Sequence, residues 1–348
     1  MKVTLRQIAN TVGCSVTTVS DALRGQRWVR TETKARVEQA AAALGYQRDP
    51  LLSRFMSELK RTGRPAFVAT LALINGHRDP AAFANHPTIP AYMKGCRRRA
   101  EELGYSFDEF WLHDPKLNAQ KWLRMLETRG IPGGILVGLM DDSHVPEPLS
   151  LVVQKVPLVV TGVRTRDPVL PFAAVDHHQL ALSAVEQALR LGYRRPALVL
   201  DRIIDRLIDG RIHAGFLIGQ MQLPPAGRIP AFTTIAEARN DPAVFDRWLR
   251  RHRPDVLFTL YNEIFDWLER ARMKVPADIG VLQLEWRSSR AEIAGFDQRN
   301  DRVGEAAVDM IVSLTREREY RPTPEVNAIL ISPTWRNGST VAARPAEV

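Results

Sequence analysis

The segment TLRQIANTVGCSVTTVSDALR, residues 4–24, predicts two short helices joined by a tight turn. Gly13 ends the first helix, where a left-handed backbone costs glycine least, and Ser15 can cap a second helix from about Val16 to Leu23. This is the layout of a helix-turn-helix motif, although an ordinary helical hairpin has the same pattern. The apolar positions at helical spacing are Leu5, Ile8, Ala9 and Val12, then Val16, Val19 and Leu23.

Positive charge gathers in the same part of the chain. The 348 residues carry a formal net charge of +9, and residues 1–64, with 12 Lys or Arg against 5 Asp or Glu, carry +7 of it. A basic segment attached to a nearly neutral remainder is typical of a nucleic-acid-binding head, although a solvated basic surface has the same charge.

Length and composition limit the class of protein. A chain of this length with 45% hydrophobic residues fits two or three domains with sizeable cores. We find no apolar run long enough to span a membrane and no apolar signal-peptide core. The two cysteines, Cys14 and Cys96, are too few for a disulfide framework or a zinc site. We therefore expect a cytoplasmic protein without a membrane partner.

Five short segments of the head form a recognisable set. They are Val3-Thr4-Leu5, Val12-Gly13-Cys14-Ser15, Thr18-Val19-Ser20, the run from Thr31 to Val37, and Ala43-Leu44-Gly45-Tyr46. These segments resemble the DNA-binding head of lactose-repressor (LacI/GalR) family transcriptional regulators, including its third helix. We expect that helix over about 32–44, with Thr31 as its cap, Gly45 as its end, and Ala35, Val37, Ala41 and Leu44 facing inward.

The resemblance also implies which head residues touch DNA. We expect base readout from Val16, which can pack on a thymine methyl, from Thr17, and from Asp21, which can accept a hydrogen bond from cytosine N4. Asp21 stands where the family often has arginine, and it could instead pair with a neighbouring arginine and read nothing. Phosphate contacts, which position the head without reading sequence, are expected from Thr4, Ser20, Arg24, Arg30 and Thr33.

Residues 47–64 predict a hinge helix. Asp49-Pro50 is a strong helix start, and an apolar stripe of Leu51, Leu52, Phe55, Met56 and Leu59 follows it. A lone helix of this length is marginal in water. By resemblance, two hinge helices pair in the minor groove, with Phe55 and its neighbour Met56 as the wedge between base steps. A linker helix docked on the body is the alternative.

The remaining residues predict an α/β body. Strand-like runs alternate with helical ones from Phe67 onward, which indicates parallel sheets covered by helices. The fold class is thus an all-α helix-turn-helix head with a two-lobed α/β body that resembles periplasmic sugar-binding proteins. The expected divisions are a head over 1–46, a hinge over 47–64 and an effector-binding and dimerisation body over 65–348, with lobe one at 65–164 plus 297–325 and lobe two at 165–296 plus 326–348. The body segments that carry the resemblance are 174–176, 191–195, 255–258, 275–281 and 304–308.

Ligands of such lobes bind beyond the carboxyl ends of strands. This rule selects Asn75, Met140, Asp141, Asn262, Glu263, Glu285 and Trp286. By resemblance, Asn262-Glu263 stands where the family usually carries Asn-Asp, and Glu285 stands where it usually carries an aspartate. Arg211 approximates a ligand-clamping arginine of an Arg-x-x-Gly-Phe segment, with the spacing off by one. Arg211 and Glu263 could equally be structural ion partners. Rings that could stack on a sugar are Phe83, Tyr92, Trp111, Tyr261 and Trp286.

These features favour a ligand-gated, homodimeric repressor that binds double-stranded operator DNA and a small-molecule effector, most simply a sugar. A solute-binding protein of sugar transport or sensing is the alternative, but it leaves the basic head without a purpose. A sugar-metabolising enzyme would need a catalytic constellation, and we identify none. Gly-x-Ser-x-Gly does not occur. We expect no cofactor and no metal.

Overall fold

The computed structural model describes residues 5–23, 29–44, 66–139, 143–147, 149–316 and 326–344. The chain divides into two compact units, Met1–Ala66 and Phe67–Val348, and each is described by itself. The predicted fold class, an all-α head and a parallel-sheet α/β body, is confirmed. Within the described residues, no helix is both long and apolar enough to cross a membrane.

In the described residues of the first unit, three helices pack together. α1 and α2 are joined by the predicted turn, in which Gly13 has a φ of +71°. The backbone N–H of Thr18 donates to Ser15 Oγ at 3.0 Å, so Ser15 caps α2 as predicted. The helices are α1 (Leu5–Val12), α2 (Val16–Leu23) and α3 (Thr31–Ala43), and their shared core is Ile8, Ala9, Val12, Val19, Ala22, Val37 and Ala41.

The expectation for α3 was wrong in its cap and in two core positions. Arg30 occupies the N-cap, and no side chain caps the helix, because Thr31 already lies in the first turn. Ala35 is exposed because two residues rotate it about 200° away from the buried Val37. Leu44 follows the last helical residue and is 38% exposed. α3 is tied to the end of α1 by Arg36, whose guanidinium donates to the Val12 carbonyl at 2.8 Å.

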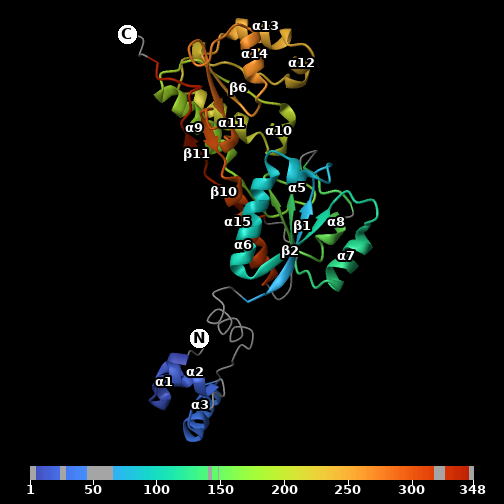
Figure 1. Ribbon diagram of the computed structural model, residues 1–348, viewed down its shortest axis with the longest axis vertical. Coiled ribbons are helices and arrows are strands. Elements are labelled where there is room, and N and C mark those ends of the chain that lie inside the picture. The colour runs from blue at the N-terminus through green and yellow to red at the C-terminus, as the bar shows by residue number, and fades with distance from the viewer. Residues whose placement is uncertain are drawn as a thin grey trace. The chain divides into compact units, whose positions relative to one another are not determined.

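The first lobe of the body has a six-stranded parallel sheet in the order β10-β5-β4-β3-β1-β2. Alternate residues of each strand face opposite layers, so α6 and α15 cover one face and α7 and α8 the other. Figure 1 shows α6 and α15 side by side. The elements are β1 (Ala69–Asn75), α5 (Ala82–Asn85), α6 (Ile89–Leu103), β2 (Tyr105–Trp111), α7 (Ala119–Thr128), β3 (Gly134–Val137), α8 (Leu149–Val152), β4 (Leu158–Thr161), β5 (Phe172–Val175), α15 (Asn300–Thr315) and β10 (Ala328–Ile331).

The second lobe has a five-stranded sheet in the order β11-β9-β8-β7-β6, parallel except at β11. α9 and α11 cover one face, and α12, α13 and α14 cover the other. The elements are α9 (His177–Arg190), β6 (Pro196–Val199), α10 (Arg202–Leu207), α11 (Arg211–Gln220), η1 (Pro225–Gly227), α12 (Ile235–Asn240), α13 (Ala243–His252), β7 (Val256–Thr259), α14 (Ile264–Arg270), β8 (Gly280–Gln283), η2 (Ser288–Arg290), β9 (Gly295–Asp297) and β11 (Thr334–Arg336).

The lobe boundaries differ from those predicted. β5 pairs with β4, and β10 pairs with β5, so residues 172–175 and 328–331 belong to the first sheet. The chain therefore leaves the first lobe near Asp176 rather than at residue 165. It leaves again after Ile331 rather than at residue 326. Strands of both sheets are equally apolar, so composition could not reveal which sheet each one joins. The crossing predicted near residue 297 lies where β9 ends and α15 begins.

Glycine allows α6 and α15 to approach closely. A methyl group added at Gly95 would overlap the Asp301 carbonyl oxygen of α15. We therefore expect Gly95→Ala to destabilise the body by about 2 kcal/mol, although Gly→Ala normally stabilises a helix. Urea denaturation followed by circular dichroism measures the change. Lys94→Ala, on the exposed side of the same helix, is the control, and equal stability of both variants would contradict the close contact.

Candidate functional sites

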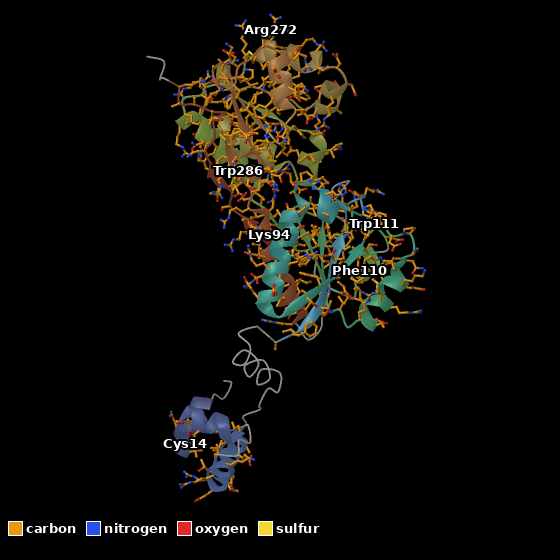
Figure 2. The ribbon with its side chains drawn as sticks, viewed as in Figure 1. Cys14, Lys94, Phe110, Trp111, Arg272 and Trp286 are labelled. Atoms are coloured by element: carbon orange, nitrogen blue, oxygen red, sulfur yellow. The ribbon has the colours of Figure 1, made fainter. Side chains whose placement is uncertain are left out.

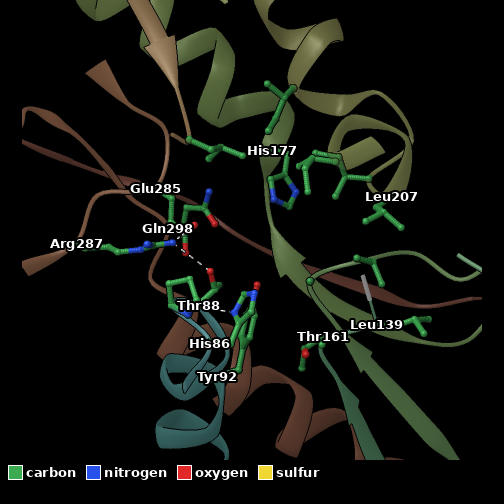
Figure 3. A pocket seen from close by; sticks show the side chains of 18 of the residues that line it. His86, Thr88, Tyr92, Leu139, Thr161, His177, Leu207, Glu285, Arg287 and Gln298 are labelled. Carbon is green, nitrogen blue, oxygen red and sulfur yellow. Dashed lines mark hydrogen bonds and ion pairs between the residues drawn. The ribbon is translucent and has the colours of Figure 1, made fainter. Parts of the chain in front are cut away.

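A cavity of about 270 Å³ lies between the two lobes of the body. Figure 3 shows Glu285, Gln298, Arg287 and Thr88 on one side of the cavity, and Leu207, Leu139 and Thr161 toward the other. Most of its lining follows the carboxyl ends of strands, as the fold rule requires. The lining residues are His86, Pro87, Thr88, Tyr92, Gly138, Leu139, Thr161, Gly162, Val163, His177, Ile204, Leu207, Ile208, Ile212, Leu260, Tyr261, Glu285, Arg287 and Gln298.

An ion pair forms the polar side of the cavity. Arg287 donates to Glu285 Oε2 at 2.8 Å and reaches across to Thr88 Oγ1, at the start of α6, at 3.4 Å. Asn300 Nδ2, at the start of α15, donates to Glu285 Oε1 at 3.3 Å. Residues of both lobes therefore hydrogen-bond this ion pair. The negative charge of the Glu285 carboxylate compensates the positive charge of the Arg287 guanidinium.

Two histidines line the cavity in their neutral form. Burial, then His77 and Arg287, lower the pKa of His86 from 6.5 to about 4. His86 Nδ1 accepts hydrogen bonds from the backbone N–H groups of Thr88 at 3.1 Å and Ile89 at 3.3 Å. The ring proton therefore sits on Nε2 and is available to donate. Burial, followed by the Arg211 charge, also lowers the pKa of His177 from 6.5 to about 4.

Two tyrosines complete the lining. Tyr92 of α6 is 5% exposed, and burial followed by the Glu285 charge raises the pKa of its hydroxyl. Burial raises the pKa of Tyr261 to about 12, and its oxygen accepts from the Asp201 backbone N–H at 3.0 Å. At neutral pH both hydroxyls are protonated, so the tyrosines add no charge to the cavity.

Some of the predicted effector residues line the cavity, and the others lie outside it. Glu285, Tyr92 and Tyr261 line the cavity, whereas the other predicted residues in the described part of the chain do not. Glu263 Oε1 accepts from Arg239 Nε at 2.6 Å, and the Arg239 guanidinium lies 5.4 Å from the centre of the Tyr261 ring. This geometry gives Glu263 the structural ion-pair role that the sequence left open.

The remaining predicted residues have structural partners outside the cavity. Asn262 accepts from Gln283 at 2.9 Å, Arg336 lies 5.3 Å from the Trp286 ring centre, and Phe83 packs on the main core. Asn75 binds the carbonyls of Asp79 and Pro80. Trp111 Nε1 donates to the backbone carbonyl of His77 at 3.0 Å, and Figure 2 shows Trp111 in the first lobe and Trp286 in the second. Met140 and Asp141 lie outside the described residues.

Few of the predicted DNA contacts lie within the described side chains. Arg30 and Thr33, at the start of α3, are exposed and half-buried respectively, so both can reach a partner. Thr4, Arg24, Phe55 and Met56 lie outside the described residues, as do the side chains of Val16, Thr17, Ser20 and Asp21.

Comparison with known proteins identifies the head. Residues 4–49 match the family described as bacterial regulatory proteins, lacI family, and this stretch contains the helices, turn and cap described above. The head, over residues 4–49, is a lacI-family domain.

Curated relatives are similar to this chain over part of their length. It is 24% identical to the HTH-type transcriptional regulator MalR of Streptococcus pneumoniae over 201 residues, 57% of each chain. It is 28% identical to the sucrose operon repressor of Escherichia coli over 192 residues, 55% of this chain and 54% of the relative. The alignments thus span just over half of each curated relative.

A solved structure supports the fold over almost the whole chain. The lac repressor dimer bound to operator and the anti-inducer ONPF superposes with a TM-score of 0.56, covering 99% of this chain and 100% of that one at 18% identity. At this identity the match shows that the folds are alike.

The chain departs from the Arg-x-x-Gly-Phe segment at a residue that lines the cavity. Ile212 stands three residues before Gly215, the place of the arginine in that segment, and Ile212 lines the cavity. Arg211 is one residue earlier and its guanidinium lies 5.9 Å from the centre of the Phe172 ring. One residue is about 100° of helix rotation, so Arg211 cannot take the position of Ile212.

Sequence reasoning missed several lining residues. Arg287 follows β8 two residues after Glu285, and His177 follows β5, so the strand-end rule could have included both. His86 and Thr88 precede a helix, and no pattern in the sequence singles them out. Four further lining residues have the spacing of an ordinary helix core, because an apolar side chain in a cavity wall repeats along a helix as one in a core does. They are Ile204, Leu207, Ile208 and Ile212.

Burial of neutral His177 predicts a loss of stability in acid. Below pH 6.5 the unfolded chain binds a proton that the folded chain refuses until about pH 4, so the free energy of unfolding falls as pH falls through this window. The loss from His177 reaches at most about 3 kcal/mol. Thermal melts of His177→Gln between pH 7.5 and 4 should show a shallower loss than the parent. His178→Gln removes the neighbouring ring as a control, and a parental pH slope in His177→Gln contradicts the assignment.

Proposed function

We propose that this chain, with its lacI-family head, is a transcriptional regulator that binds double-stranded operator DNA, represses transcription, and is controlled by a small-molecule effector, most simply a sugar, in the cavity between its lobes. The observation that carries the proposal is the family match over residues 4–49 together with the capped helix-turn-helix geometry of α1 and α2. The names of the curated relatives, which are regulators and operon repressors, support regulation rather than catalysis.

DNA recognition is assigned to the head. Val16, Thr17 and Asp21 read base edges in the major groove, and Thr4, Ser20, Arg24, Arg30 and Thr33 hold phosphates. Two chains act as a homodimer, so their heads read two half-sites whose spacing follows from the dimer. Phe55 and Met56 wedge into the minor groove between them. The working compartment is the cytoplasm, where the operator is.

The effector acts through the contacts between the lobes. The Arg287–Thr88 hydrogen bond joins β8 of the second lobe to α6 of the first, so a ligand that binds between Arg287 and Thr88 changes how the lobes hold each other. A change of lobe pose alters pairing of the hinge segments and hence operator affinity. Because such coupling is reciprocal, operator DNA changes effector affinity by the same factor.

The head should bind DNA with a strong dependence on salt. We expect the affinity for a duplex selected from a random pool to fall about 10³-fold or more between 50 and 200 mM salt, because each phosphate contact releases counterions. Arg30→Ala should weaken binding to all duplexes equally and reduce the salt slope by about 1. Fluorescence anisotropy measures both.

Arg190→Ala removes the same charge from an exposed position on α9 of the body and is the matched control. If the parent binds no duplex, or binds with no salt dependence, the proposed function fails.

Asp21 tests base readout by the second helix. We expect Asp21→Ala to change the preferred base at one position of the selected operator, because the carboxylate is a specific acceptor for cytosine N4. Sequencing of duplexes selected by parent and variant gives the two motifs. Glu38→Ala, on the exposed side of α3, is the control. An unchanged motif would show that Asp21 has no role in base readout.

A further inference from the structure

The side of the cavity opposite the Glu285–Arg287 pair is hydrocarbon. Ile204 and Leu207 come from α10, Ile208 follows it, and Ile212 comes from α11; we call these four residues the aliphatic wall. Leu207, Ile208 and Ile212 are 6%, 7% and 1% exposed. None of the four side chains offers a donor or an acceptor, so a ligand group on this wall gains only by burying apolar surface.

The first lobe extends the hydrocarbon surface. Leu139 and Val163, which follow β3 and β4, line the same cavity and are 5% and 7% exposed. Figure 3 shows Leu139 and Leu207 on the same side of the cavity, away from Arg287. Apolar side chains from both lobes therefore surround one end of the ligand space. A hydroxyl group placed against these apolar side chains would lose water and gain no hydrogen bond from them, which costs free energy.

The other end of the cavity can hydrogen-bond hydroxyl groups. Glu285 and Arg287 supply an acceptor and a donor, and Thr88 lies beside them.

The cavity also disfavours a charged ligand. Glu285 already offsets Arg287, and His86 and His177 are neutral at physiological pH. A ligand carboxylate or phosphate would lose its water without an uncompensated cation to replace it. The volume of about 270 Å³ is at the small end of ligand sites, which suits one sugar ring with a compact attached group.

We propose that the effector is an uncharged glycoside whose aglycone is a hydrocarbon group, with the sugar hydroxyls on the Glu285–Arg287 side and the aglycone on the aliphatic wall. This inference rests on the proposed function and assigns its ligand class. Ile212 is the specificity-determining residue, because it stands where the Arg-x-x-Gly-Phe segment has a cation. The wall selects against a disaccharide, whose second ring carries hydroxyls, although one relative is named for sucrose.

The test compares matched probes on the full-length protein. Isothermal titration calorimetry measures the Kd of methyl and phenyl glycosides of glucose and of galactose, in both anomers, and of cellobiose and glucose 6-phosphate. For one sugar at least, the phenyl glycoside should bind at least about tenfold tighter than the methyl glycoside, because the ring buries more apolar surface. It should also bind tighter than cellobiose and glucose 6-phosphate.

Variants of the wall assign the preference to its residues. Ile212→Thr should reduce the phenyl-to-methyl ratio about tenfold and leave the methyl glycoside within about threefold of the parent. Ile204→Thr, at a half-buried position, repeats the test if Ile212→Thr does not fold. Ile218→Thr, on the same helix as Ile212 but 50% exposed, should keep the parental ratio.

Three results overturn the proposal: equal or tighter binding of the methyl glycosides, tighter binding of cellobiose or glucose 6-phosphate, or no binding of any phenyl glycoside. Anisotropy with the selected operator, measured on the same preparation, separates this failure from that of the proposed function. A protein that binds operator but prefers another ligand class refutes only the glycoside assignment. A protein that binds no duplex refutes the regulator itself.

Discussion

The contact between α6 and α15 holds together the parts of the cavity that come from distant stretches of sequence. Gly95 and Gly304 lie at the crossing, where added methyl groups would overlap the backbone of the opposite helix. The start of α6 carries Thr88, and the start of α15 carries Asn300, which donates to Glu285. Without close packing of the two helices, the chain that returns from the second lobe would not set its polar groups beside Arg287.

Charge compensation explains why the strand-end residues have different roles. The strand-end rule selected Glu263 and Glu285 alike, and both are paired with an arginine. Glu263 pairs with Arg239 of α12 and stabilises the second lobe, whereas Glu285 pairs with Arg287 against the first lobe. The partner, rather than the carboxylate, decides which of the two serves the cavity. A partner on another element is not visible in the sequence.

Much of the fold could be predicted from the sequence, because local patterns decide it. The alternation of apolar strands and amphipathic helices indicated the parallel sheets, and Gly13 with Ser15 indicated the turn and cap of the head. Lobe membership of β5 and β10 could not be predicted, since it depends on which strands they pair with. Glu285 was within reach of the strand-end rule. Ile212 could not be predicted by that rule. Only the folded structure shows whether an apolar side chain of a helix lines a cavity or packs in a core.

Because the cavity lies between the lobes, a ligand bound there can change how the two lobes of the body are held together. Its polar side includes Thr88 from the first lobe and Arg287 from the second, and its apolar side includes Leu139 from the first and Leu207 from the second. A ligand with a polar and an apolar end therefore contacts both lobes at each of its ends. Such a ligand binds more tightly when the lobes are close together than when they are apart. That difference in affinity between the two poses is the free energy available to shift their equilibrium. A ligand that contacted a single lobe, however tightly it bound, would shift nothing.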